Sequence, residues 1–142
     1  MHKAHELLST IPFSQFSHLA SQERCEIDFE FLGFTEQYKM LSSVIPKDFT
    51  IVDLGCYMAF QSHYFKDHKQ YIGVDVCELE RYKTSNSTHF TMSIQEFIIS
   101  VLPTLNLDLG KTFAICNYVP DTEATSFARK TFSNIFCFYP DL

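Results

Sequence analysis

The sequence predicts a three-layer α/β fold: a doubly wound, mostly parallel sheet of about five strands in the order 3-2-1-4-5, with an N-terminal helical extension. Three observations predict it. Short apolar runs alternate with segments of helical periodicity, the layout of parallel sheets with right-handed crossovers. The run at 49–54 is rich in aromatic and β-branched residues and ends at Gly55, which permits a tight turn. The run at 112–117 is apolar almost throughout, as in a buried parallel strand.

The 142 residues have the length of a single domain, in which we expect residues 1–46 to form the helical extension and 47–142 the α/β core. Ser21 has the character of a helix N-cap, and apolar residues then recur at intervals of three and four up to Leu41. This pattern predicts a helix that packs one face on the sheet and ends before Pro46.

The core elements follow one another as strand, helix and strand. A polar, irregular segment at 77–88 takes the place of the second crossover helix. Besides the strands at 49–54 and 112–117, we expect a helix at 58–66, strands at 71–76 and 89–92, a helix at 94–102, a loop at 106–111, a helix from Asp121 or Thr122 to about Lys130, and a strand at 134–139. Two alternatives follow for the edge of the fifth strand. Either the chain is a minimal version of this fold, or a second copy of the chain or a partner protein covers that edge.

Composition narrows the class of protein. Net charge is −6, with 17 acidic against 11 basic residues, which argues against a general nucleic-acid binder. No run approaches the roughly 18 apolar residues of a membrane span, and the N-terminus lacks the apolar core of a signal peptide. We expect a soluble, cytoplasmic protein without a membrane partner. The 15 Phe and 7 Tyr are expected mainly in the core, and an aromatic partner surface is the alternative.

The five cysteines form no C-x-x-C pair, which argues against a zinc ribbon. Cys56, Cys77 and Cys116 follow or end predicted strands and could meet at one edge of the sheet, so a metal or redox cluster is an alternative. Small buried side chains in a reducing compartment are the better explanation, and no metal is expected.

A nucleotide-binding βαβ unit has the order strand, glycine turn, helix, strand and acid, and the segment from the first to the second predicted strand follows this order. Gly55 and Asp75 are 20 positions apart, the spacing at which such an acid meets a ribose hydroxyl. Ligands of open α/β sheets bind outside the carboxyl ends of the strands, at the point where strand order reverses. The residues expected at this edge are Asp53, Gly55, Tyr57, Asp75, Val76, Ser93, Ile94, Asn117 and Tyr118.

These residues carry a family resemblance. VDLGC at 52–56, YIGVDV at 71–76 and FAICNYVPD at 113–121 resemble the first, second and fourth motifs of S-adenosylmethionine-dependent methyltransferases with a Rossmann-like fold. The resemblance covers roughly residues 35–139. The glycine loop of that family usually reads D/E-x-G-x-G-x-G. Here only its first glycine, Gly55, is present, and Tyr57 and Ala59 occupy the other two glycine positions.

The resemblance implies S-adenosylmethionine as cofactor and a role for several residues. Asp75 would accept hydrogen bonds from both ribose hydroxyls. Val76 and Ile94 would enclose the adenine, and Ser93 would bond to its amino group, where the family often has an acid.

On the methionine side, the resemblance implies that Asp53 meets the amino group of the cofactor, directly or through water. Tyr57 either fills the methionine pocket or moves aside. Asn117 and Tyr118 open a loop similar to the N-P-P-Y loop of amino-methylating enzymes, with a different residue order. The alternative is a simple turn that closes the fourth strand.

The leading hypothesis is therefore a small S-adenosylmethionine-dependent methyltransferase. A catalytically inactive relative that acts as a protein interaction module is the second hypothesis, favoured by the reduced glycine loop. Binding of another nucleotide such as NAD at Asp75 is the third. A single glycine argues against it, because a pyrophosphate requires closer backbone approach.

Overall fold

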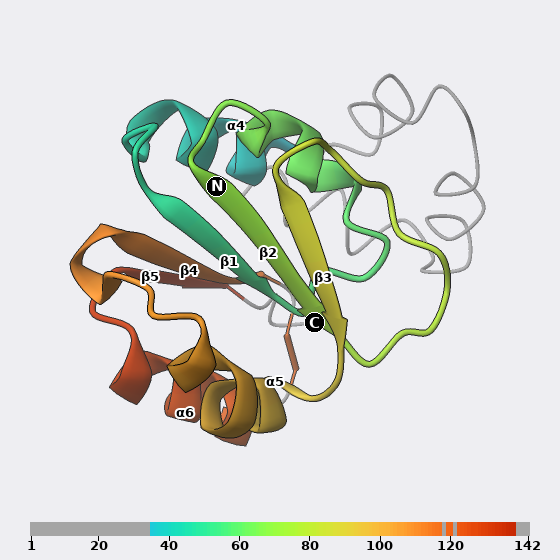
Figure 1. Cartoon of the computed structure of the whole chain (residues 1–142), viewed down its shortest axis with the longest axis vertical. Coiled ribbons are helices and arrows are strands. Elements are labelled where there is room, and N and C mark those ends of the chain that lie inside the picture. The colour runs from blue at the N-terminus through green and yellow to red at the C-terminus, as the bar shows by residue number, and fades with distance from the viewer. Residues whose placement is uncertain (1–34, 118, 121, 139–142) are drawn as a thin grey trace.

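The computed structural model describes residues 35–117, 119–120 and 122–138. They form a five-stranded, all-parallel sheet in the order β3-β2-β1-β4-β5, with helices on both faces (Figure 1). This confirms the predicted α/β class and strand order. Of the predicted N-terminal extension, only the final helix α4 (Thr35–Val44) belongs to the described residues. The helix start predicted at Ser21 lies outside them.

The strands match the predicted runs to within one or two residues at either end. They are β1 (Thr50–Leu54), β2 (Gln70–Asp75), β3 (Ser87–Thr91), β4 (Thr112–Asn117) and β5 (Ile135–Phe138). β1 is central, because Thr50 pairs with both Gln70 and Thr112, and all five of its residues are buried. An entirely buried strand explains why this run is apolar except for Thr50 and Asp53.

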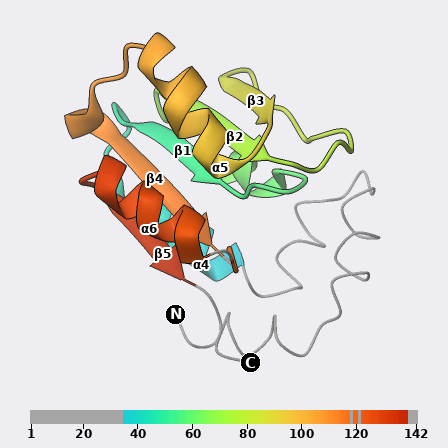
Figure 2. The ribbon, with the colours of Figure 1, turned by 90° about the horizontal axis from the view of Figure 1, so that it is seen from below.

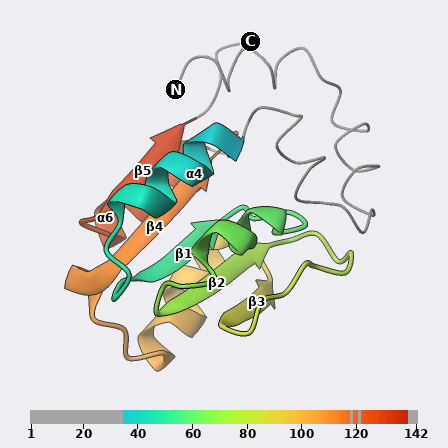
Figure 3. The same ribbon diagram turned by 90° about the horizontal axis from the view of Figure 1, so that it is seen from above.

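The helices divide between the two faces of the sheet. α4 and the 3₁₀ helix η1 (Phe60–Phe65) cover one face, as the view from above shows (Figure 3). The other face carries α5 (Ile94–Glu96), the π-helix η2 (Phe97–Val101) and α6 (Thr122–Thr131) (Figure 2). Two further 3₁₀ turns, η3 (Leu102–Thr104) and η4 (Leu109–Lys111), precede β4.

Two predicted helices differ in form. The crossover expected at 58–66 is the six-residue 3₁₀ helix η1, made mostly of Phe, Tyr, Ser and His, which are weak helix formers. The helix expected at 94–102 changes type along its length, from α5 through the π-helix η2 to η3 at Pro103. Between β2 and β3 the chain forms no helix, as predicted for the polar segment at 77–88.

Each face of the sheet packs against its own apolar cluster. Tyr38 and Phe65 lie in the cluster below α4 and η1, whereas Phe97 and Phe132 lie in the cluster below α5 and α6. All four aromatic rings are buried. Among the described residues, none of the exposed large apolar side chains is aromatic. The aromatic side chains of this part therefore serve mainly as core, as expected.

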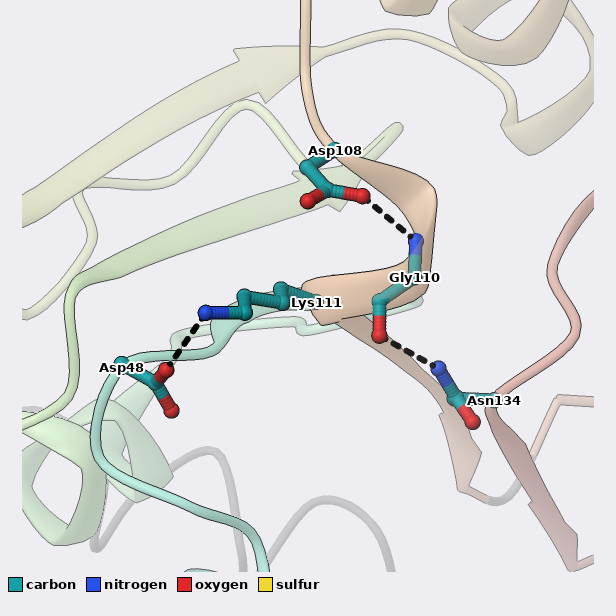
Figure 4. Close-up of polar contacts among 5 residues, drawn as sticks. All are labelled: Asp48, Asp108, Gly110, Lys111 and Asn134. Atoms are coloured by element: carbon teal, nitrogen blue, oxygen red, sulfur yellow. Dashed lines mark hydrogen bonds and ion pairs between the residues drawn. The ribbon is translucent and has the colours of Figure 1, made fainter.

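The amino edge of the sheet is tied by polar contacts on its surface. Lys111 Nζ lies 3.0 Å from Asp48 Oδ2, and the Gly110 amide donates to Asp108 Oδ1 over 3.0 Å (Figure 4). Asn134 Nδ2 donates to the Gly110 carbonyl over 3.4 Å. An ion pair as exposed as that of Lys111 contributes little to stability. This edge lies at the opposite ends of the strands from the predicted site.

Within the described part of the chain, no helix is long and apolar enough to cross a membrane. β5 ends the sheet, and the described residues include no strand that pairs with its outer edge. The expected partner or second copy at that edge stays a prediction.

Candidate functional site

The loop 55–59 connects β1 to η1 with an unusual backbone. φ is +85° at Gly55, +51° at Tyr57 and +62° at Ala59. These are the three positions at which the methyltransferase pattern has glycine. For residues with a Cβ, this left-handed conformation is unfavourable by about 1–2 kcal/mol each. The chain thus keeps a glycine-type loop conformation at two positions where glycine is absent.

Hydrogen bonds attach this loop to the end of β2. The amides of Gly55 and Cys56 both donate to the Val74 carbonyl, over 2.7 and 3.0 Å. The Tyr57 amide donates to Asp75 Oδ2 over 2.9 Å. The half-buried Tyr57 side chain packs against the core cluster below α4 and η1. The loop therefore lies directly beside the predicted ribose-binding acid.

Asp75 ends β2 and is half-buried. Oδ2 accepts from the Tyr57 amide, and Oδ1 accepts from the Cys77 amide over 2.8 Å. A carboxylate oxygen has two lone-pair directions, so each oxygen retains one for a further donor. The same carboxylate can thus hold the loop and accept hydroxyl groups from a ligand.

Asp53 is fully buried near the end of β1. Oδ2 accepts from the Tyr71 hydroxyl over 2.5 Å and from Gln61 Nε2 over 2.7 Å, while Oδ1 is buried without a hydrogen-bond partner among the described residues. Loss of hydration raises the Asp53 pKa to about 6, against the opposing effect of the two donors. A buried carboxylate with one unused oxygen and a raised pKa is typical of functional sites.

Asn117, at the end of β4, is a second buried polar group without partners. Its side chain is 4% exposed, and neither its Oδ1 nor its Nδ2 has a hydrogen-bond partner within the described part of the chain. Asp53 pairs with Ile115 in the sheet, so Asn117 projects from the same face as Asp53. Unpaired buried amides are unfavourable, which indicates a place for a polar ligand or water. Tyr118 lies outside the described residues.

The remaining predicted residues are more dispersed. Val76 follows Asp75 and is 68% exposed. Ile94 is buried in the core below α5, and the Ser93 hydroxyl caps α5 by accepting from the Glu96 amide over 3.1 Å. Of the two apolar side chains expected to enclose adenine, only Val76 is therefore largely open to solvent.

Two residues important for this edge were not predicted. Gln61 bonds both to Asp53 and to the Cys56 carbonyl. Arg81 is buried, and its guanidinium donates to the carbonyls of Asp75, Cys77 and Phe90. In the sequence, Gln61 begins a short polar stretch between aromatic residues, and Arg81 stands in a charged segment typical of solvated loops. Neither pattern reveals a buried hydrogen-bonding role.

A separate cavity of about 260 Å³ lies between α6 and the ends of β4 and β5. The described members of the predicted site do not line it. Its lining residues are Cys116, Val119, Pro120, Thr122, Thr125, Ser126, Arg129 and Cys137. Cys116 and Cys137 are register partners in the sheet, both are free thiols, and burial raises the Cys116 pKa. The described residues contain no group of three or more potential metal ligands.

Comparison of the chain with known protein families, with curated proteins and with solved structures finds no match. The resemblance to methyltransferases therefore rests on the sequence motifs of the chain.

Proposed function

We propose that the domain binds S-adenosylmethionine at the carboxyl edge of β1, β2 and β4 and is a small S-adenosylmethionine-dependent methyltransferase. The observation that carries the proposal is the left-handed backbone at positions 55, 57 and 59, held by hydrogen bonds beside the acid that ends β2. The enzyme would act in the cytoplasm, where reducing conditions keep the described cysteines as free thiols.

The chemistry of the polar groups at this edge supports the proposal. Asp75 has lone pairs available for two ribose hydroxyls, and the exposed Val76 offers an apolar contact for the base. Asp53 Oδ1 is an unused carboxylate oxygen suited to the ammonium group of the methionine part, and Asn117 offers an unpaired amide close to the switch point. When bound, the cofactor supplies an already activated methyl group, so the protein needs mainly to align it.

A catalytically inactive interaction module is the second candidate. Both oxygens of Asp75 already accept backbone amides, from Tyr57 and Cys77, so the acid has a structural role without any ligand. Val76 and Leu79, on the loop that follows β2, are 68% and 55% exposed, which offers apolar surface to a protein partner.

Calorimetry with S-adenosylhomocysteine, the demethylated product, tests the proposal. The parent protein should bind it, and Asp75→Ala should weaken binding roughly tenfold or more, because a charge-assisted hydrogen bond contributes about 1.5–3 kcal/mol. Asp48→Ala removes an acid at the opposite edge and should leave the affinity unchanged. Absence of heat for the parent at millimolar ligand would exclude cofactor binding and favour the interaction module.

Tyr57→Gly tests whether the Tyr57 side chain obstructs the methionine pocket. We expect tighter binding of S-adenosylhomocysteine, because the change lets the backbone approach the ligand. With φ at +51°, glycine relieves backbone strain of about 1–2 kcal/mol, which should offset the lost side-chain packing. Paired titrations of parent and variant decide the sign of the effect. Weaker binding would instead mean that Tyr57 closes over the ligand, and unchanged affinity would mean that it points away.

A further inference from the structure

Gln61 connects two parts of the site through a single amide group. It belongs to η1, and its side chain is 3% exposed. Nε2 donates to Asp53 Oδ2 over 2.7 Å and to the Cys56 carbonyl over 2.9 Å. One side chain therefore joins the acid near the end of β1 to the second residue of the loop 55–59.

The loop requires such support because its backbone conformation is unfavourable for Tyr57 and Ala59. Glycine would populate positive φ readily, whereas residues with a Cβ do not. The Cys56 carbonyl accepts from both Gln61 Nε2 and the Ala59 amide, the latter over 2.9 Å. Asp75 holds Tyr57 from the other side through its amide. The Cys56 carbonyl and the Tyr57 amide belong to one peptide group, so Gln61 and Asp75 hold both polar ends of the peptide that precedes the first strained residue.

The same amide also determines which oxygen of Asp53 is available. Gln61 and Tyr71 both donate to Oδ2, and Oδ1 remains without a partner among the described residues. Two donors on one oxygen fix the orientation of the carboxylate group. The unused oxygen is then presented in one direction only.

We infer that Gln61 is a positioning residue: its side chain replaces the conformational preference that glycine at positions 57 and 59 would provide, and it orients Asp53 for the ligand. This inference rests on the proposed function for its ligand, although its effect on the loop can be measured without one. It also explains how a loop with one glycine keeps positive φ at three alternate residues.

Gln61→Met keeps the length of the side chain and removes the amide. The Kd for S-adenosylhomocysteine should rise about tenfold, the effect of losing interactions worth about 1.4 kcal/mol. Hydrogen exchange of the Tyr57 and Ala59 amides should accelerate about tenfold or more through local opening. The Gly55 and Cys56 amides, which bond to the Val74 carbonyl, serve as internal references and should keep their rates. Gln70→Met, at the start of β2, is the matched control and should change neither affinity nor loop exchange.

A rescue variant separates positioning from a purely structural role. Adding Ala59→Gly to Gln61→Met should restore part of the affinity, because glycine adopts the loop conformation without assistance. Ala59→Gly alone measures what glycine contributes to the parent loop, and the gain in affinity from this change should be larger in the Gln61→Met background than in the parent. The inference would be overturned, in favour of a general packing role for Gln61, by either of two results. One is that Ala59→Gly restores no affinity to Gln61→Met. The other is that exchange accelerates equally at the reference amides.

The two proposals fail in different ways. If the parent shows no binding while Gln61→Met still accelerates exchange at Tyr57 and Ala59, the cofactor is wrong and the loop-holding role stands. If the parent binds and Gln61→Met changes neither affinity nor exchange, the inference is wrong and the proposed function stands.

Discussion

Asp53→Asn should stabilise the protein by about 2 kcal/mol near pH 8, although it removes two hydrogen-bond acceptor sites of a buried group. The Asp53 pKa is about 6 in the folded protein, against the ordinary value of 3.8 expected in the unfolded chain, because burial disfavours the charged form. Above pH 6 the folded state holds an unfavourable buried charge that the unfolded state hydrates. Two pKa units correspond to about 3 kcal/mol, of which the unpaired amide of the variant should offset a part.

The pH dependence identifies the cause of this effect. As pH falls from 6 towards 3.8, Asp53 takes up a proton in the folded state before it does so in the unfolded state. The buried charge of the parent is then neutralised, so the difference in the free energy of unfolding between Asp53→Asn and the parent should shrink. Urea unfolding of both proteins between about pH 4 and pH 8 measures the difference. Asp48→Asn, at an exposed ion pair, should give no stabilisation at any of these pH values. If Asp53→Asn raises the free energy of unfolding by the same amount at every pH, the stabilisation does not come from removing a buried charge.

The same variant should bind S-adenosylhomocysteine less tightly than the parent. An acid that destabilises the fold and supports ligand binding is an example of the usual conflict between stability and function. Asp53 is thus the residue at which the proposed function and the stability of the domain oppose each other.

Gly55→Ala should destabilise the protein by about 2–4 kcal/mol, from a left-handed backbone and from overpacking together. φ at Gly55 is +85°, and a Cβ added there would lie 2.8 Å from Val119 Cγ2. Denaturant midpoints should show the loss. Gly110→Ala is the control: its Cβ would lie 3.2 Å from Asp108 Oδ1 on an exposed turn, where a small effect is expected. Equal stability of Gly55→Ala and the parent would mean that the loop does not pack against Val119.

The sequence was sufficient to predict the strands because apolar runs and glycine turns are local patterns. β1, β2 and β4 are buried along most of their length, and their interiors are mainly apolar, with polar residues at or next to the strand ends. The alternation of elements then fixed the strand order, since right-handed crossovers leave few topologies.

The details of the site depended on contacts that no local pattern encodes. Gln61 reaches Asp53 across eight positions and Tyr71 reaches it across 18, so their partnership appears only once β1, η1 and β2 are packed. Positive φ at Tyr57 and Ala59 contradicts residue preference, and the Tyr57 amide is held by a hydrogen bond to Asp75, 18 positions away. The Ser93 hydroxyl caps α5 by accepting a hydrogen bond from an amide of its first turn. A serine before a helix also predicts such a cap, whereas we expected this hydroxyl to have a role in ligand binding.

Amide chemical-shift mapping of the full chain with S-adenosylhomocysteine tests the central claim most directly. The account predicts the largest shifts at the loop 55–59 and at residues 75–77, with the Tyr57 and Cys77 amides foremost because both donate to Asp75. Gly110 and Lys111, at the amino edge, should not shift. No shifts at millimolar ligand, or shifts confined to the cavity between α6 and β5, would contradict a cofactor site at the carboxyl edge of β1, β2 and β4.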